Sequence, residues 1–279
     1  NKHTDMNNKI DVVHSVLLEM LQWFHEQCER NGLRYYVVGG TMLGTIRHQG
    51  FIPWDDDIDV GMPRKDYMEF VQKYSKEFHA PYIVEYPRGD NLDYPYVFAK
   101  IYDTRTYLVE HLRHLVKRGL YIDVFPLDGI GDTRESAYKN YQPILRNLRL
   151  HDMVTCAFRN NRKWYKNLSI ILGRSISPLF VSERFLNNRI NHFCEQRDFD
   201  SSEYVGNLVG NWGIKEIMHR SFFGMPKAYV FESIKVLGVE KPHEYLKTLY
   251  NDYMVLPPME RRVSHHDYVE LDLKKTFLK

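Results

Sequence analysis

The sequence predicts a mixed α/β fold of the α+β kind, with helices flanking a sheet, and three observations support this prediction. Residues 10–30 repeat apolar side chains at helical spacing, which is typical of an amphipathic helix that packs on a sheet. Residues 35–38, Tyr-Tyr-Val-Val, form a β-branched and aromatic run that stops at a Gly-Gly pair, which indicates a strand ending in a turn. From residue 134 onward the pattern changes and helices predominate.

The composition of the 279 residues is that of an ordinary globular protein, with 43% hydrophobic and 27% charged residues. The formal net charge of +2 is too small to indicate a nucleic-acid partner, and we expect none. The three cysteines, Cys28, Cys156 and Cys194, are far apart and favour reduced thiols in a cytoplasmic protein. The first ten residues are polar and no apolar stretch approaches ~20 residues, so we expect neither a signal peptide nor a transmembrane helix.

A glycine pair follows the first predicted strand. We expect Thr41 to cap a short helix that runs through Ile46. Adjacent glycines let the backbone come close to a ligand, and the N-terminus of a helix attracts phosphate. Gly39, Gly40 and Thr41 are therefore predicted to hold a substrate phosphate through backbone N–H groups.

An acidic cluster follows this helix, and it consists of Asp55, Asp56, Asp57 and Asp59. Alternate residues of a strand share a face, so Asp57 and Asp59 would project together while Ile58 and Val60 face the core. Two carboxylates on one face repel each other unless a cation lies between them. Because Mg²⁺ is commonly held by one or two carboxylates plus substrate phosphates, we expect this ion here. The alternative, an acidic turn in a solvated loop, fits the alternation of apolar and acidic residues less well.

The segment from Tyr35 to Arg64 resembles the signature of the LicD family. This family comprises phosphocholine transferases with a nucleotidyltransferase-type fold and is related to fukutin-related sugar-phosphate transferases. The matching residues are Gly39-Gly40, Arg47-His48, residues 50–59 (Gly-Phe-Ile-Pro-Trp-Asp-Asp-Asp-Ile-Asp) and Met62-Pro63-Arg64.

The resemblance implies a nucleotidyltransferase-like catalytic core over residues 1–130, built on a mixed sheet flanked by helices. It also implies a mainly helical lobe over residues 131–279 that packs on the core and completes the substrate site. Within the motif, Arg47 and His48 are candidate substrate-binding residues. The resemblance extends to about His265 but is specific only in the first half of the chain.

The segment after the acidic cluster predicts a helix that begins at Pro63, followed by strands over residues 81–85 and 96–102. Lys100 lies in the second of these strands, where it either faces solvent at a sheet edge or reaches a phosphate. His111 and His114 stand one helical turn apart, and we interpret them as a polar helix face rather than a zinc site.

Residues 119–129 predict a buried strand that carries one carboxylate, Asp123, and ends at Pro126 and a turn through Asp128. An ionised aspartate in such a strand is costly unless a cation or several hydrogen-bond donors meet it. The LicD resemblance implies that Asp123 supplies a third metal carboxylate, from a strand beside the one that carries Asp59.

Residues 134–166 hold eight basic and two acidic residues, a local net charge of +6, and an apolar segment follows at 168–173. We interpret this run as a helical lobe with a solvated basic face. The alternative is peripheral contact with anionic lipid at the inner face of the membrane. A further helix is predicted over residues 183–198, and Arg262 and His265 are weak candidates for phosphate contacts.

Together these residues predict metal-dependent phosphoryl transfer. Asp57, Asp59 and Asp123 would hold one or two Mg²⁺ ions, with Mn²⁺ as the alternative ion. Asp123, or in second place Asp55, would take the proton of the acceptor hydroxyl. Lys100 is retained as a candidate substrate contact.

The LicD resemblance supplies the expected substrates of this reaction. It implies CDP-choline as the donor, CMP as the leaving group and a sugar hydroxyl as the acceptor, on a lipid-linked precursor of teichoic acid or lipopolysaccharide. The alternatives are a nucleotidyltransferase, a transferase of ribitol or glycerol phosphate from another CDP-alcohol, and a non-catalytic choline- or glycan-binding module. We expect a cytoplasmic enzyme.

Overall fold

The computed structural model describes residues 2–87, 94–156, 165, 168, 170–171, 182–264 and 268–278. The helices are α1 (Lys2–Asn31), α2 (Gly39–His48), α3 (Arg64–Tyr74), α4 (Arg134–Thr155), α6 (Glu183–Cys194) and α7 (Pro242–Tyr250), with short 3₁₀ helices η1 (Gly213–Glu216), η2 (Arg220–Phe222) and η3 (Met259–Arg261). The strands are β1 (Tyr36–Val37), β2 (Asp59–Pro63), β3 (Tyr82–Glu85), β4 (Ala99–Asp103), β5 (Tyr107–His111), β6 (Leu115–Arg118), β7 (Tyr121–Gly131), β8 (Tyr204–Gly206), β9 (Ile217–His219), β10 (Lys227–Phe231), β11 (Ile234–Gly238) and β12 (Tyr268–Asp272). The predicted mixed α/β class is confirmed.

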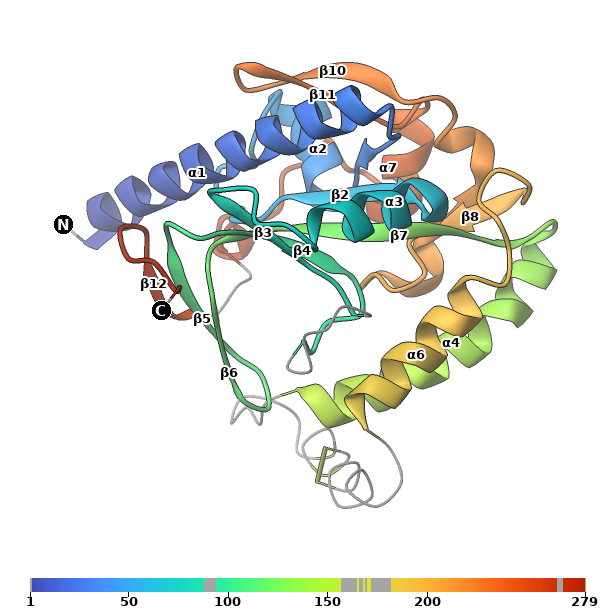
Figure 1. Ribbon diagram of the computed structural model, residues 1–279. Coiled ribbons are helices and arrows are strands. Elements are labelled where there is room, and N and C mark those ends of the chain that lie inside the picture. Colours follow the sequence, from blue (N-terminus) through green and yellow to red (C-terminus); the bar gives the residue numbers. More distant parts are fainter. Residues whose placement is uncertain are drawn as a thin grey trace.

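The main sheet, within the described residues, contains nine strands. Seven follow the order β10-β11-β1-β2-β7-β4-β3, and β8 and β9 attach through β7. Two pairs, β2 with β7 and β1 with β11, are parallel, whereas the other pairs are antiparallel, so the predicted mixed sheet is confirmed. Figure 1 shows α1 running beside β11, while α4 and α6 lie side by side away from it.

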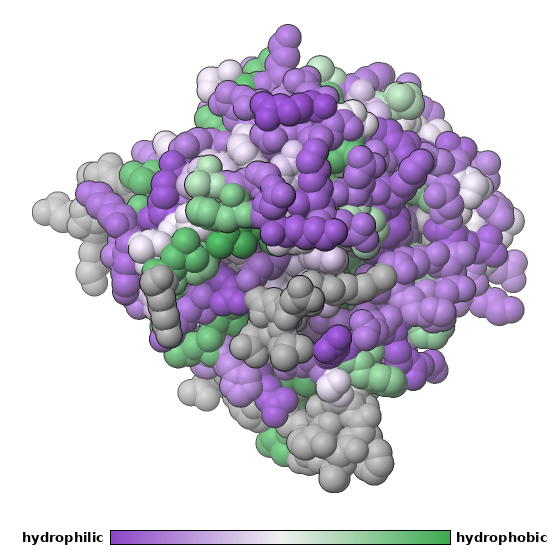
Figure 2. Space-filling view, in the orientation of Figure 1, coloured by the Kyte–Doolittle hydropathy of each residue, from purple (hydrophilic) through white to green (hydrophobic). Residues whose placement is uncertain are grey.

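The core forms around β7, whose eleven residues are all buried between its neighbours β2 and β4. A strand that is covered on both faces favours a nearly continuous apolar run. This run is the pattern that predicts a buried strand over residues 119–129. The helix predicted over residues 10–30 is also confirmed, because α1 buries Leu17, Met20 and Phe24 completely. It ends at Asn31, where Gly32 adopts a φ of 63° that favours glycine at the end of a helix. The face shown in Figure 2 is mainly hydrophilic, with apolar residues in small groups.

The predicted cap of α2 is wrong. The helix begins at Gly39, with Val38 as its N-cap, so that Thr41 lies inside the first turn. Gly39 adopts a φ of 53°, a left-handed conformation that lets the chain turn into the helix three residues earlier than expected. The Thr41 hydroxyl instead accepts a hydrogen bond from the backbone N–H of Asp59 at 2.8 Å.

The helix predicted around His111 and His114 is also wrong. His111 ends β5 and pairs with Leu115 of β6, so both histidines belong to a β-hairpin. β12, from the end of the chain, pairs with β5 and forms a third strand. This long-range pairing overrides the helical spacing of the local sequence. The zinc interpretation gains no support, because no group of three potential metal-binding side chains occurs within the described ranges.

Asp128 does not lie in a turn. β7 continues past Pro126 to Gly131, and the Asp128 carboxylate is buried inside the strand. Arg64 donates to both of its oxygens, at 2.8 Å and 2.5 Å. The turn prediction fails because this bidentate partner, which comes from α3, stabilises a carboxylate that the local sequence places in an apolar run.

The second half of the chain supplies the predicted helices α4 and α6, and also α7 and several strands that were not predicted as individual elements. β11 pairs with β1, so this half extends the sheet of the first half. The division of the chain at residue 130 stays a prediction. Most of residues 157–181, which include the end of the basic run and the apolar segment after it, lie outside the described residues, as does His265. None of the helices in the described ranges combines the length and apolar character needed to cross a bilayer.

Candidate active site

The acidic site, defined here as Asp55, Asp57, Asp59 and Asp123, is organised by two central strands. β2 and β7 are parallel neighbours, and their register places Asp59 directly opposite Asp123. The backbone N–H of Asp123 donates to the carbonyl of Ile58 at 3.0 Å, which fixes this register. Two carboxylates that lie 64 positions apart in the sequence are therefore side by side in the sheet.

The glycine pair faces these carboxylates. A Cβ atom on Gly39 would lie 3.1 Å from Oδ2 of Asp59, and one on Gly40 would lie 3.0 Å from Oδ2 of Asp55. Glycine therefore permits the close approach of the α2 N-terminus to the acidic site, whereas the predicted approach of this pair to a phosphate stays a prediction. The positive end of the α2 dipole stabilises negative charge at this position.

Burial and mutual repulsion raise the pKa values of two carboxyl groups in the acidic site. Burial raises the pKa of Asp59 well above its usual range, and the negative charges of Asp57, Asp123 and Asp55 raise it further. Burial also raises the pKa of Asp123 to about 6, although the ammonium of Lys100 acts in the opposite direction. Carboxylates gathered in this way are costly to ionise together unless a cation shares them.

The donor set of the acidic site fits a hard cation such as Mg²⁺, because it offers only carboxylate oxygens. Within the part of the chain that the structure describes, no three acidic, histidine or cysteine side chains form a complete metal cluster. An ion at this site would thus need oxygens from a bound substrate. Mg²⁺ is typically held in this manner, by one or two carboxylates together with phosphates.

Lys100 lies inside the sheet rather than at its edge, so the solvent-edge alternative is wrong. Its strand β4 runs between β7 and β3, and the side chain is 2% exposed. Nζ lies 2.7 Å from Oδ1 of Asp123. The ring centroids of Tyr121 and Tyr96 lie 3.3 Å and 4.4 Å from the same Nζ. Lys100 therefore compensates the charge of Asp123 from an aromatic environment.

Two of the predicted phosphate contacts already have partners within the protein. The backbone N–H of Gly39 donates to the hydroxyl of Tyr245 at 3.0 Å. The Thr41 hydroxyl binds the backbone of Asp59, as described above. These bonds attach α7 and β2 to the start of α2, so a phosphate at Gly39 would have to displace the Tyr245 hydroxyl.

Arg47 and His48 lie at the other end of α2. Arg47 follows Gly39 by eight residues, or about 12 Å along the helix axis. Arg47 donates to the carbonyl of Tyr253 at 2.8 Å, and the His48 ring lies 6.3 Å from the ring of Trp54. Burial and the neighbouring Arg47 lower the pKa of His48. The structure therefore separates these two residues from the glycine pair.

Arg262, the weak candidate for a phosphate contact, lies with Arg47 and His48 around Trp54, and we call these three residues the cationic group. Its guanidinium lies 5.5 Å from the centre of the Trp54 ring and donates to the carbonyl of Pro257 at 2.9 Å. Because Trp54 directly precedes Asp55, the cationic group borders the acidic site.

Three residues that lie beside the acidic site were not predicted to take part in it: Glu216, Tyr245 and Tyr250. Burial raises the pKa of the Tyr250 hydroxyl, and the charges of Tyr245, Asp59 and others add to this effect. Burial also raises the pKa of Glu216 to about 7. The aromatic residues of the C-terminal segment are visible in the sequence, but only the contact between α7 and α2 reveals that they face the aspartates.

Comparison with known proteins gives one family and several relatives. Residues 32–160 match the nucleotidyltransferase domain of the LicD/FKTN/FKRP family. The lipopolysaccharide cholinephosphotransferase LicD of Haemophilus influenzae is 30% identical over 256 residues, which cover 90% of this chain and 93% of that protein. Human ribitol 5-phosphate transferase FKRP is 47% identical over 38 residues, 14% of this chain and 8% of that protein. Mannosyltransferase regulator 4 of Saccharomyces cerevisiae is 30% identical over 229 residues, 78% of this chain and 18% of that protein.

Proposed function

The chain belongs to the LicD family, as the sequence predicts, and we propose that it transfers phosphocholine to a sugar hydroxyl of a cell-surface glycan precursor. It is a transferase, as the family is enzymatic. The observation that carries the proposal is the register that sets Asp59 opposite Asp123, next to the glycine pair. The similarity to a cholinephosphotransferase along almost the whole chain supports phosphocholine as the transferred group.

We propose that Asp57, Asp59 and Asp123 hold one or two Mg²⁺ ions, or Mn²⁺, together with the diphosphate of CDP-choline. When bound, the cation would neutralise part of the phosphate charge and stabilise the attacking and leaving oxygens. The glycine pair and the start of α2 would approach the phosphates closely. Arg47 and His48, at the far end of α2, would contact a more distant part of the substrates.

Asp123 is the proposed general base if the cation does not fully occupy its carboxylate, with Asp55 as the alternative. A carboxylate accepts the proton of the sugar hydroxyl while the sugar oxygen forms a bond to the phosphorus that carries choline. The bond between this phosphorus and the bridging oxygen breaks, and CMP leaves with that oxygen. The pKa of about 6 suits Asp123 for proton transfer near neutral pH. Lys100 would hold the Asp123 carboxylate in position through its 2.7 Å contact.

The test is an incubation with Mg²⁺ and a lipid-linked glycan precursor, using CDP-choline, CDP-ribitol, CDP-glycerol and CTP as separate donors. We expect CMP release from CDP-choline, which Asp59→Asn should slow about 10³-fold. Asp132→Asn is a matched control, because this exposed carboxylate lies at the other end of the β7 region and contacts only Arg197 among the described ion pairs.

Each alternative has its own outcome in this experiment. Pyrophosphate from CTP would indicate nucleotidyl transfer, and turnover of only CDP-ribitol or CDP-glycerol would change the transferred alcohol. Calorimetry that detects neither nucleotide nor Mg²⁺ binding would contradict the catalytic proposal and favour a choline- or glycan-binding module.

We propose that the acceptor is lipid-linked and that the enzyme acts in the cytoplasm, peripherally at the inner face of the membrane. The basic residues of α4 that precede residue 157 support this location, because anionic lipid attracts such residues. Co-sedimentation with liposomes, with and without anionic lipid, provides the test. Equal and negligible binding in both samples would contradict it.

A further inference from the structure

A pocket of about 550 Å³ lies between α4, β9, η1 and α7, and we call it the α4–β9 pocket. None of the four aspartates of the acidic site lines it. The helix α7 stands between the two sites, because Thr248 lines the pocket whereas Tyr245 binds Gly39. The pocket is therefore a separate site.

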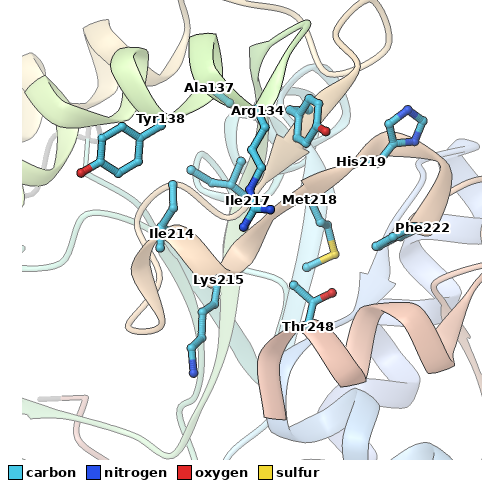
Figure 3. Close-up of a pocket in the computed structure, with 11 residues that line it drawn as sticks. Arg134, Ala137, Tyr138, Ile214, Lys215, Ile217, Met218, His219, Phe222 and Thr248 are labelled. Carbon is cyan, nitrogen blue, oxygen red and sulfur yellow. The ribbon is translucent and has the colours of Figure 1, made fainter. Parts of the chain in front are cut away.

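The lining of the α4–β9 pocket is mainly apolar yet accessible. Figure 3 shows Ala137 and Tyr138 of α4 on one side of the cavity, with Ile217 and Met218 of β9 across from them. Tyr138 is 57% exposed and Ile214 is 45% exposed. Apolar side chains that gather around an open cavity are typical of a ligand site.

The charge of the pocket has one sign. Arg134 and Lys215 line it, and no carboxylate does. Within the described ranges neither cation takes part in an ion pair, whereas the third basic group, His219, lies 2.9 Å from Glu203. In Figure 3 the Arg134 side chain reaches from α4 toward Ile217, while Lys215 extends away at the edge. An unpaired guanidinium above an apolar surface is complementary to an anion attached to an apolar body.

We propose that the α4–β9 pocket binds an amphiphile that joins a phosphate group to an alkyl or isoprenyl chain. The chain would lie against Ile217, Met218 and Phe222, and the phosphate would accept hydrogen bonds from Arg134. Lys215 would add positive charge at the entrance. The site requires no metal and does not depend on the reaction proposed for the acidic site.

The test is calorimetry with decyl phosphate below its micellar concentration, in EDTA so that no metal draws phosphate to the acidic site. We expect one molecule to bind per chain, with decanol and inorganic phosphate each binding roughly tenfold more weakly or worse, because each lacks one half of the contacts. Equal affinity for decanol, or no binding of decyl phosphate, would overturn the proposal.

Variants locate the binding site. Arg134→Gln should weaken decyl phosphate binding roughly tenfold, as expected for the loss of a charged hydrogen-bond partner. Lys139→Gln, also on the exposed surface of α4 but outside the pocket, should leave the affinity unchanged. Thr248→Trp should block the cavity without emptying the core, because Thr248 is exposed. Unchanged binding in both Arg134→Gln and Thr248→Trp would place the ligand elsewhere and contradict the proposal.

The same chemistry could be presented free in solution or within a bilayer. Sedimentation with uncharged phosphatidylcholine vesicles, with and without decyl phosphate and in the wild type and Arg134→Gln, distinguishes these sources, because such vesicles do not attract the other basic residues of α4. Either source agrees with the proposal as long as the loss of binding follows Arg134.

Discussion

Two buried aspartates on the same strand, Asp123 and Asp128 of β7, have different surroundings. Asp128 receives two hydrogen bonds from Arg64, at 2.8 Å and 2.5 Å, and Arg64 also approaches Glu195, directly after α6, at 3.5 Å. Asp123 receives one bond from Lys100, at 2.7 Å, and faces Asp59 across the strand pair. The first pair links α3 and α6 to the sheet, whereas the second leaves a carboxylate among like charges. Burial alone therefore does not identify a functional carboxylate. The number of cationic and acidic partners around the carboxylate separates Asp123 from Asp128.

The largest expected effect comes from Asp59→Asn, which removes a carboxylate from the acidic site. We expect CMP release to fall about 10³-fold, because a metal contact contributes several kcal/mol to the transition state. The free energy of unfolding should stay the same or rise, since repulsion with Asp57 and Asp123 is relieved. Single-turnover kinetics and urea unfolding measure the two quantities. A loss of stability without a loss of turnover would contradict this expectation, because it would give Asp59 the structural role that we assign to Asp128.

Asp128→Asn should have the opposite signature. It leaves Arg64 buried beside a neutral group, and we expect about 3 kcal/mol lower stability. CMP release per folded molecule should remain within about threefold of the wild type, because Asp128 lies outside the acidic site. Urea unfolding and active-site titration provide the comparison. A thousandfold slower reaction in a stable Asp128→Asn protein would contradict the account.

Lys100→Met tests the comparison through the pH dependence of the free energy of unfolding. Without the ammonium, the pKa of Asp123 should rise further above its present value of about 6. A carboxyl whose pKa is higher in the folded than in the unfolded protein destabilises the fold as pH rises through the two values. The variant should thus lose about 3 kcal/mol of stability at pH 8 and clearly less at pH 5. Urea unfolding at both pH values tests this, with Lys100→Met/Asp123→Asn as the control that removes the pH dependence.

The smallest effect concerns the glycine pair. Gly39→Ala places a Cβ atom 3.1 Å from Oδ2 of Asp59 at a φ of 53°, and we expect about 1 kcal/mol lower stability together with slower turnover. Gly32→Ala is a matched control, because Gly32 has a φ of 63° and nothing within 4 Å of its Cβ position. Both variants should lose similar stability, but only Gly39→Ala should slow CMP release. Equal turnover in the two would show that the glycine pair does not serve the site.

The sequence predicts the parts of this molecule that depend on local patterns. Helix α1, strand β7 and the strand-turn-helix unit at Gly39 follow from hydrophobic spacing and glycine. The structure also sets Asp59 and Asp123 side by side, as the family resemblance implies. The helix, the strand and the turn need no knowledge of distant contacts, whereas the pairing of Asp59 with Asp123 followed only from the resemblance.

The remainder depends on long-range pairing that no local pattern contains. The hairpin at His111 forms because β12 pairs with β5, and Asp128 stays in β7 because Arg64 reaches it from α3. Tyr245 approaches Gly39 across 206 positions of the chain. Lys100 could not be assigned from the sequence, because solvent edge and buried partner differ only in the strand order.

We propose that the acidic site binds a divalent cation together with the donor diphosphate. Titration of Mn²⁺ followed by electron paramagnetic resonance tests it directly, in the wild type and in Asp59→Asn, with and without CDP-choline. We predict that the wild type depletes the free Mn²⁺ signal strongly only when CDP-choline is present, and that Asp59→Asn shows little depletion beyond that caused by CDP-choline alone. Equal depletion by the two proteins would contradict the claim.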